Sequence, residues 1–399
     1  MQIITLSLFI FLLINQVKLD QTIIMSYFSE LKPAPRVYLG EKVNNLYLYL
    51  SLQEQYTWIS IPSSKAYNIS KENTINQVEL QRNGQKLNAL TYSASLYFDS
   101  NEPAIDNYYF YIFNLQEEKN KGKIFGPGGI GLAHKFRDEK FSIVHSLYNL
   151  KKIERKIFSI ADFDKHITIG MIYFGKLPTN AEKKKYQGKC SVSKNSINWG
   201  CKLKRVEIGE FSYNAKRDNM LFETSFENII VPEKFLDFVN ETVLKTHKHG
   251  CEYTNNLKGT KFIKCHMDEL EALPIYRFIF EGVEFDIPMG RLFVDGLDTS
   301  DSALLSNKDL TGDPDLWVFG GRFLSNFITV FNYDDNEISF FTNKYVIKVP
   351  NLSNIDELVL ILFKGLILFI CINLFFLIYI KKQLSNYYLN RKYSEKLSI

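Results

Sequence analysis

Two carboxylates lie inside a strongly apolar stretch near the middle of the chain. The stretch is residues 220–232, "MLFETSFENIIVP", and its carboxylates belong to Glu223 and Glu227. The apolar side chains around them predict burial, where an unpaired charge is costly. Two buried carboxyl groups that face each other can act as general acid and general base, because like charges force their pKa values apart. The stretch therefore indicates either a catalytic carboxyl group or a place where one used to be.

Short strands must position these side chains, because most of the chain has the pattern of β-structure. Segments such as "LYLYLSL", "YTWISI", "YYFYIFNL" and "YRFIFEGVEFDI" are aromatic or β-branched and are bounded by Gly, Asn, Asp or Pro. Apolar residues at helical spacing predict only two short helices, over residues 140–153 and 232–247. The polar, Lys-rich segment 182–200 predicts a solvated connection between two lobes. Together these patterns predict a mostly-β fold.

Five stretches of the sequence occur in an order that is typical of one protein family. They are residues 128–135 ("GGIGLAHK"), 141–160 ("FSIVHSLYNLKKIERKIFSI"), 197–210 ("INWGCKLKRVEIGE"), 265–288 ("CHMDELEALPIYRFIFEGVEFDIP") and 317–341 ("WVFGGRFLSNFITVFNYDDNEISFF"). Together they resemble the pepsin-like aspartic proteases over about residues 35–345, although Gly321 replaces an Asp of that family. The resemblance implies a bilobal double β-barrel with a central cleft, with lobes at residues 27–181 and 182–347.

The resemblance also places the two loops that carry the family's catalytic Asp residues. In the second lobe that Asp lies nine residues before a Pro, and counting back from Pro232 gives Glu223. In the first lobe, eleven residues separate the Asp from a Gly in the preceding turn, and counting from Gly40 gives Ser51. Trp58 then falls on the Trp that closes the family's motif. Ser51 and Glu223 therefore occupy the two catalytic positions.

Neither position retains the residue that the chemistry of this family requires. Hydrolysis needs two carboxyl groups that share one proton around a water molecule. The hydroxyl group of Ser51 has no proton equilibrium in the acid range, so it cannot form such a pair with Glu223. The longer side chain of Glu223 also displaces its carboxyl group by about 1 Å, which can cost on the order of 10²-fold in rate. We therefore predict that both positions are non-functional in aspartic-protease catalysis.

The residues around these positions depart from the family as well. Gln53 and Ser225 stand where the family has Gly, so we expect backbone strain there. Leu52 lacks the hydroxyl group that would bond across the two loops, whereas Thr224 keeps it. Glu54 lies too far along the loop to replace Ser51. Glu227 is expected at the cleft edge or the lobe interface, paired or solvated.

The flap that covers the cleft in this family is also altered. If Asp99 matches a later Asp of the family, residues 86–100, "KLNALTYSASLYFDS", should contain the flap. Leu87 then falls near the position of the flap Tyr, and Tyr92 comes too late. No Gly is present in this segment. We therefore expect a flap without its usual Tyr and glycines.

The two ends of the chain predict a membrane anchor. Residues 1–20 contain an apolar block that is too short to span a bilayer and suits a signal peptide cleaved between residues 16 and 26; a buried N-terminal segment is the alternative. Leu358–Ile380 has the length and apolar character of a transmembrane helix, with a buried core helix as the alternative. Basic residues in the tail, 381–399, place the C-terminus in the cytosol. We expect a single-pass type I protein with a lumenal or extracellular ectodomain.

The predicted compartment determines how the cysteines and sequons are interpreted. Cys190, Cys201, Cys251 and Cys265 allow three disulfide connectivities, of which nearest-neighbour pairing gives Cys190–Cys201 and Cys251–Cys265. Asn68, Asn240 and Asn351 begin glycosylation sequons.

Histidines lie close in sequence to the second pair of cysteines. His247, His249 and His266 could bind zinc together with Cys251 and Cys265. A Cys251–Cys265 disulfide with exposed histidines around it is the alternative, and both the compartment and the resemblance favour it. We therefore predict no metal ion and no cofactor.

Charge and the altered motifs limit the function. The 48 basic and 44 acidic residues are spread along the chain, and no basic block suggests nucleic acid. The favoured hypothesis is a membrane-anchored homologue that holds a peptide or protein ligand in its cleft without cleaving it. Two alternatives stay open: an endopeptidase that is active at acidic pH with a non-standard dyad, and a structural glycoprotein with a filled cleft.

Overall fold

The computed structural model of the 399-residue chain describes seventeen segments between residues 23 and 342. Two compact units are distinguished, Met1–Val346 and Ile347–Ile399, and every described residue belongs to the first unit. The described residues are 23–28, 36–40, 45–61, 74–82, 85–98, 103–114, 128–161, 169–177, 185–215, 220–226, 228–245, 251–255, 260–266, 273–294, 299–302, 304–306 and 313–342.

Several predicted features lie outside these residues. They are the signal peptide at 1–20, the transmembrane helix Leu358–Ile380, the tail at 381–399, Asn68, Asn351, Glu227, His247 and His249. Within the described part of the chain, no helix has both the length and the apolar character that crossing a membrane requires.

The first half of the chain forms a large sheet. Its strands follow the order β3-β2-β7-β8-β5-β9-β4, and β6 pairs with β7 at the side of this path. The alternating burial of Arg36–Leu39 and Lys86–Thr91 is the period-2 pattern of strands with one face on a core. The strands are β2 (Arg36–Leu39), β3 (Asn45–Tyr47), β4 (Tyr49–Ser51), β5 (Trp58–Ile61), β6 (Thr74–Arg82), β7 (Gln85–Tyr97), β8 (Ile105–Asn114) and β9 (Gly128–Gly131).

The second half forms three four-stranded sheets. Their orders are β14-β13-β19-β20, β15-β24-β16-β23 and β17-β18-β22-β21. The strands are β13 (Leu203–Ile208), β14 (Phe211–Asn214), β15 (Met220–Phe222), β16 (Ile229–Val231), β17 (Cys251–Asn255), β18 (Lys261–His266), β19 (Ile275–Phe280), β20 (Glu284–Pro288), β21 (Phe293–Val294), β22 (Thr299–Ser302), β23 (Leu304–Ser306) and β24 (Trp317–Phe319).

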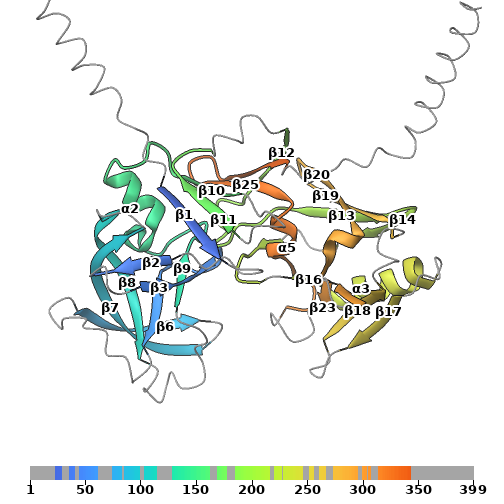
Figure 1. Cartoon of the computed structure of the whole chain (residues 1–399), viewed down its shortest axis with the longest axis horizontal. Coiled ribbons are helices and arrows are strands. Elements are labelled where there is room, and N and C mark those ends of the chain that lie inside the picture. Colours follow the sequence, from blue (N-terminus) through green and yellow to red (C-terminus); the bar gives the residue numbers. More distant parts are fainter. Residues whose placement is uncertain are drawn as a thin grey trace, which may run out of the picture. The chain divides into compact units, whose positions relative to one another are not determined.

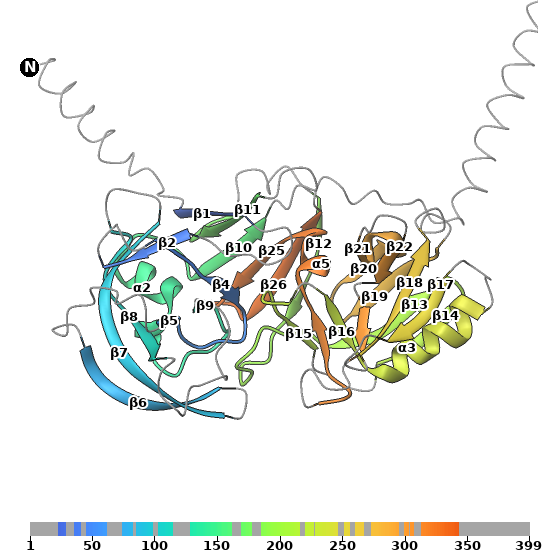
Figure 2. The same cartoon turned by 60° about the horizontal axis from the view of Figure 1, so that its bottom comes forward.

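A six-stranded sheet joins the two halves of the chain, in the order β1-β11-β10-β25-β26-β12. Figure 2 shows it between the blue strands of the first half and the yellow strands of the second. The two halves meet where β10 pairs antiparallel with β25, with Phe158 opposite Phe331. The strands are β1 (Ile23–Phe28), β10 (Ile157–Ala161), β11 (Ile169–Phe174), β12 (Tyr186–Ser191), β25 (Phe327–Asn332) and β26 (Glu337–Thr342).

This sheet differs from the sequence-based expectation at two places. β1 begins at Ile23, four residues before the predicted start of the first lobe at residue 27. The segment 182–200 is not only a solvated connection, because it contains β12, which pairs with β26. Both strands were missed because an edge strand needs little apolar sequence of its own when the neighbouring strand supplies the hydrogen-bond partners.

In the part of the chain that the structure describes, helices are few and short, as the sequence predicts (Figure 1). The helix predicted over residues 140–153 is α2, Ile143–Asn149, where the Ser142 hydroxyl oxygen accepts a hydrogen bond from the His145 amide at 3.3 Å. The helix predicted over residues 232–247 is α3, Glu233–Val239, which continues as the π-helical turn η4, Asn240–Leu244. The remaining helical turns are η2 (Glu139–Phe141), η6 (Met289–Leu292) and α5 (Gly321–Leu324).

The core of the second half is built largely from phenylalanine rings around Phe323. The side chain of Phe323 on α5 is 0% exposed. Its ring lies 4.6 Å from Phe319 and 5.3 Å from Phe327, measured between ring centroids. Its further ring neighbours, at 5.4–6.3 Å, are Phe222, Phe278, Phe280 and Phe285. This ring cluster holds the strand that ends directly before Glu223.

The substitution Phe323→Ala tests how strongly this cluster supports the fold. Because the cavity would be lined by rings that cannot easily collapse, we expect the free energy of unfolding to fall by about 3–5 kcal/mol. Urea denaturation of the full-length protein measures the loss. Ile197→Ala, at a side chain that is 49% exposed, is the control and should change stability by less than about 0.5 kcal/mol.

Candidate functional site

Ser51 ends strand β4, and three strands fix its position. β4 runs parallel to β9, with Ser51 opposite Gly131, and β9 runs antiparallel to β5. The Leu132 amide donates a hydrogen bond to the Ser51 carbonyl oxygen at 2.8 Å. A Cβ atom at Gly131 would lie 2.5 Å from the Glu54 carbonyl oxygen. Only glycine therefore lets β9 pass this close to the loop that carries Ser51.

Glu223 follows strand β15 in a corresponding arrangement. β15 runs parallel to β24, and β24 runs antiparallel to β16. The Glu223 amide donates a hydrogen bond to the Phe319 carbonyl oxygen at 3.1 Å. In each half of the chain, the strand before the loop (β4 or β15) pairs in parallel with a later strand (β9 or β24). That later strand also pairs antiparallel with the strand after the loop (β5 or β16). Ser51 and Glu223 thus occupy equivalent places in the two halves.

The structure brings these two side chains into contact. The Ser51 hydroxyl group donates a hydrogen bond to Glu223 Oε2 at 3.2 Å. Ser51 Oγ also accepts hydrogen bonds from the amides of Gln53 and Glu54, at 3.3 and 3.2 Å. Glu223 Oε1 accepts a hydrogen bond from the Ser225 amide at 2.8 Å. Ser51 is 7% exposed and Glu223 is 1% exposed, so the site is a buried pair of one alcohol and one acid.

Burial also controls the ionisation of the acid. Loss of solvation raises the pKa of Glu223 to about 7, although hydrogen bonds from Ser225, Ser51 and the Leu52 amide oppose the shift. Among the described residues, no second carboxyl group contributes to this shift. The groups that contact Glu223 are hydroxyl and amide donors, which stabilise the ionised form but cannot exchange a proton with it in the acid range.

The loops that carry the pair are joined by a buried hydrogen bond. The Thr224 hydroxyl group donates to the Leu50 carbonyl oxygen at 2.8 Å. Leu52 makes no corresponding bond with its side chain, which is fully buried in the apolar core. The expected strain at Gln53 and Ser225 is wrong, because neither residue has a positive φ. The polar side chains are accommodated at both former glycine positions in ordinary backbone conformations.

Trp58 lies on β5 in a small apolar cluster. Its ring is 5.8 Å from that of Phe113 between centroids, and Leu87 and Ala89 complete the buried part of the cluster. Leu87 lies on β7 and packs on the same cluster as Trp58. The position predicted for the flap Tyr is therefore filled by an apolar side chain.

The predicted flap segment, residues 86–100, contains no Gly, and most of it is strand β7. β6 and β7 form a hairpin in which Arg82 pairs with Gln85. The connection between them is Asn83–Gly84, which lies outside the described residues. Asn-Gly between two strands is the strongest short signal for a tight hairpin turn.

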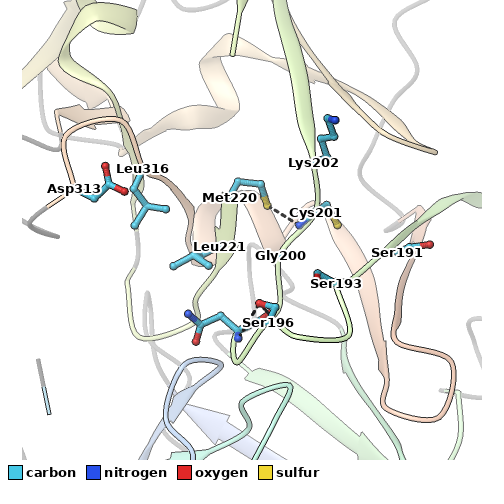
Figure 3. Close-up of a pocket in the computed structure, with 11 residues that line it drawn as sticks. Ser191, Ser193, Ser196, Gly200, Cys201, Lys202, Met220, Leu221, Asp313 and Leu316 are labelled. Carbon is cyan, nitrogen blue, oxygen red and sulfur yellow. Dashed lines mark hydrogen bonds between the residues drawn. The ribbon is translucent and has the colours of Figure 1, made fainter. Parts of the chain in front are cut away.

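A pocket borders the strand that leads to Glu223, and the sequence did not reveal it. This pocket of about 550 Å³ borders β15 from the side of Met220 and Leu221 (Figure 3). The Cys201 amide donates to Met220 Sδ at 3.4 Å at its wall. Neither Ser51 nor Glu223 lines it. The lining residues are Ser191, Ser193, Ser196, Asn198, Gly200, Cys201, Lys202, Met220, Leu221, Asp313 and Leu316.

Both nearest-neighbour disulfides are present in the structure. Cys190 is bonded to Cys201, with their Cα atoms 5.9 Å apart, and Cys251 is bonded to Cys265 across β17 and β18. The second bond occupies the two thiols of the alternative zinc site. Within the described residues, no three His, Cys, Asp or Glu side chains gather to hold a metal ion. Asn240 of the remaining sequon is half-buried where α3 passes into η4.

A comparison with protein families decides the family. The sequence profile of the family described as Eukaryotic aspartyl protease matches residues 113–343, more than half of the chain. The chain belongs to this family. The matched part of this aspartyl protease homologue includes Glu223, whereas Ser51 precedes it.

Comparison with solved structures supports the fold of this aspartyl protease homologue. The crystal structure of aspartic proteinase from Irpex lacteus superposes with a TM-score of 0.62. The match covers 82% of this chain and 100% of that one, at 12% sequence identity. The predicted family and the mostly-β, pepsin-like fold are thereby confirmed. A search of curated proteins found no match.

The raised pKa of Glu223 predicts how stability depends on pH. The folded state binds the Glu223 proton more tightly than the unfolded state, whose pKa is near 4.5. Its contribution to stability is therefore complete below about pH 4.5 and is lost as the pH rises to about 7, a change on the order of 3 kcal/mol. Urea denaturation over this range measures it.

Glu223→Gln should remove this part of the pH dependence, because the amide does not titrate. At neutral pH the variant should be more stable than the wild type. Glu210→Gln, at an exposed position on the same lobe, should follow the wild-type curve. Parallel stability curves for the wild type and Glu223→Gln would show that the carboxyl group is not desolvated as the structure indicates.

The cross-loop hydrogen bond can be tested at Thr224. Thr224→Val keeps the shape of the side chain but leaves the Leu50 carbonyl oxygen without this donor, so we expect a loss of about 1–3 kcal/mol in unfolding free energy. Thr224→Ser keeps the hydroxyl group and should lose less. Equal losses for the two variants, measured by urea denaturation, would mean that packing of the methyl group matters and the hydrogen bond does not.

Proposed function

We propose that this aspartyl protease homologue binds an extended peptide or protein segment and does not hydrolyse it by the mechanism of its family. Membership of the family implies binding of a peptide substrate. The observation that carries the proposal is the Ser51–Glu223 contact, in which an alcohol stands where the second acid is required. The ligand would lie over this pair, in the cleft that the family resemblance leads us to expect.

The protonation state of the Ser51–Glu223 pair at acidic pH supports binding without hydrolysis. The pKa of Glu223 is about 7, so the carboxyl group carries its proton at acidic pH. The pair then presents one hydroxyl and one carboxylic acid, both of which can donate hydrogen bonds to a peptide carbonyl oxygen. No ionised carboxylate remains at the pair to take a proton from water, and that step is required for attack on the peptide bond.

One observation favours the second candidate, an endopeptidase that is active at acidic pH. The Thr224–Leu50 hydrogen bond and the equivalent strand arrangement hold Glu223 at a place corresponding to Ser51. Such a site keeps one of the two carboxyl groups that catalysis requires, that of Glu223, in position. An active enzyme would need a second acid from elsewhere, such as the ligand itself.

The proposal includes anchoring at a membrane. The apolar stretch Leu358–Ile380 and the basic residues that follow it support a single span with a cytoplasmic tail. The ectodomain would then be lumenal or extracellular, where the two disulfides and the glycosylation sequons are compatible with an oxidising compartment. Extraction of the full-length protein at high pH tests this, because a spanning protein stays with the membrane and a peripheral one is released.

Cleavage of a denatured protein substrate at acidic pH tests the central claim. We expect no cleavage that pepstatin blocks from the wild-type protein. The double variant Ser51→Asp, Glu223→Asp restores two carboxyl groups of the usual length and should acquire such cleavage. The single variant Glu223→Asp keeps Ser51 and is the matched control, which should remain inactive.

Pepstatin-blocked cleavage by the wild-type protein would contradict the proposal directly. Peptide capture separates binding from a purely structural role. Wild-type protein should retain peptides from a random library, and pepstatin, which mimics an extended peptide, should compete with them. A protein that retains no peptide at any pH would favour the structural alternative.

A further inference from the structure

The Ser51–Glu223 pair contains the parts of a different kind of chemistry. A serine hydroxyl group that donates to a buried carboxylate has its proton acceptor already in place, at 3.2 Å from Oγ to Oε2. This is the distance and geometry that a nucleophile and its general base require. The same contact that prevents aspartic-protease chemistry therefore prepares Ser51 to lose its proton.

Two backbone amides stabilise the negative charge that develops on Ser51 Oγ as its proton leaves. Ser51 Oγ accepts hydrogen bonds from the amides of Gln53 and Glu54, at 3.3 and 3.2 Å. Hydrogen bonds from N–H groups to an oxygen strengthen as negative charge develops on it, and they act most strongly where water is excluded. Ser51 is 7% exposed, so these donors face the oxygen in a largely dry site.

The carboxyl group is held for the role of base. The Ser225 amide donates to Glu223 Oε1 at 2.8 Å, and Oε2 accepts the hydrogen bond from the serine hydroxyl group. Burial raises the pKa of Glu223 to about 7, which is close to the value at which a general base works best near neutral pH. Above this pH the carboxyl group is ionised and can accept the proton.

We propose that Ser51 is a nucleophile, with Glu223 as its general base, toward an ester or amide carbonyl group of a ligand held at this site. Ser51 Oγ forms a bond to the carbonyl carbon while its proton passes to Glu223 Oε2. The bond from that carbon to the leaving group breaks, and the alcohol or amine departs with the proton from Glu223. Water then attacks the carbonyl carbon of the acyl-serine ester and gives a proton to Glu223. The bond from that carbon to Ser51 Oγ breaks, Oγ takes the proton from Glu223, and the acyl group leaves as a carboxylic acid.

This activity goes beyond the proposed function. Holding a peptide does not require Ser51 to react, and the two claims predict different pH ranges. Peptide capture by a protonated pair is expected at acidic pH. Covalent reaction of Ser51 requires the ionised carboxylate, so it is expected at neutral and alkaline pH.

A fluorophosphonate probe tests the proposal, because it reacts with activated serines by forming an Oγ–P bond and releasing fluoride. Full-length protein is incubated with the probe, and the labelled residue is identified by mass spectrometry of its peptides. We expect labelling at Ser51, with a rate that rises through about pH 7 as Glu223 ionises and then levels off.

Matched variants separate the two roles. Ser51→Ala should lose the label, and Glu223→Gln should lower the labelling rate about 10²-fold and lose its rise with pH. Ser212→Ala and Glu210→Gln, at exposed positions of the second half, should label like the wild type. Urea denaturation of each variant shows whether it is folded under the conditions of the assay.

The outcomes of the two tests can be told apart. Absence of label at Ser51 in folded wild-type protein overturns this inference, and so does labelling whose rate Glu223→Gln leaves unchanged. Neither result affects the proposed function, which fails only if the wild type cleaves in a pepstatin-sensitive manner or captures no peptide. Wild-type protein that captures peptide, shows no pepstatin-sensitive cleavage and takes the label at Ser51 would support both.

Discussion

The buried carboxyl group of Glu223, to whose ionisation no second acid among the described residues contributes, is the constraint on which this site depends. Glu223 is 1% exposed, and a charge there is costly unless hydrogen bonds compensate it. The structure supplies donors from Ser51 and Ser225, but they do not offset the loss of water, so the pKa rises to about 7. A second carboxyl group would share a proton with the first, whereas a hydroxyl group can only donate to it. The identity of residue 51 thus decides which chemistry is available.

The fold keeps this pair together even though the residues have changed. In each half of the chain, the strand that leads to the site pairs in parallel with a later strand. These pairs are β4 with β9 in the first half and β15 with β24 in the second. Backbone hydrogen bonds make this arrangement, so it tolerates substitution of the side chains at the loop tips. The six-stranded sheet and the Thr224–Leu50 bond then fix the halves against each other.

Much of the site could be predicted because its position in the sequence is set by spacing. Counting from Gly40 and from Pro232 reached the two residues that the structure brings into contact. The predictions that depended on local conformation were less successful. Strain at Gln53 and Ser225 was expected from their replacement of glycine, yet neither has a positive φ.

The sequence by itself determined the family, the mostly-β class and the absence of a second acid at residue 51, because these follow from residue type, order and spacing. It could not determine the ionisation of Glu223 or the bonds that Ser51 makes. Those depend on how much water the packed side chains exclude and on amides that only the folded loop aims at Ser51 Oγ. Desolvation and the Ser51–Glu223 hydrogen bond are properties of the assembled structure, since they arise between segments that lie far apart in the chain.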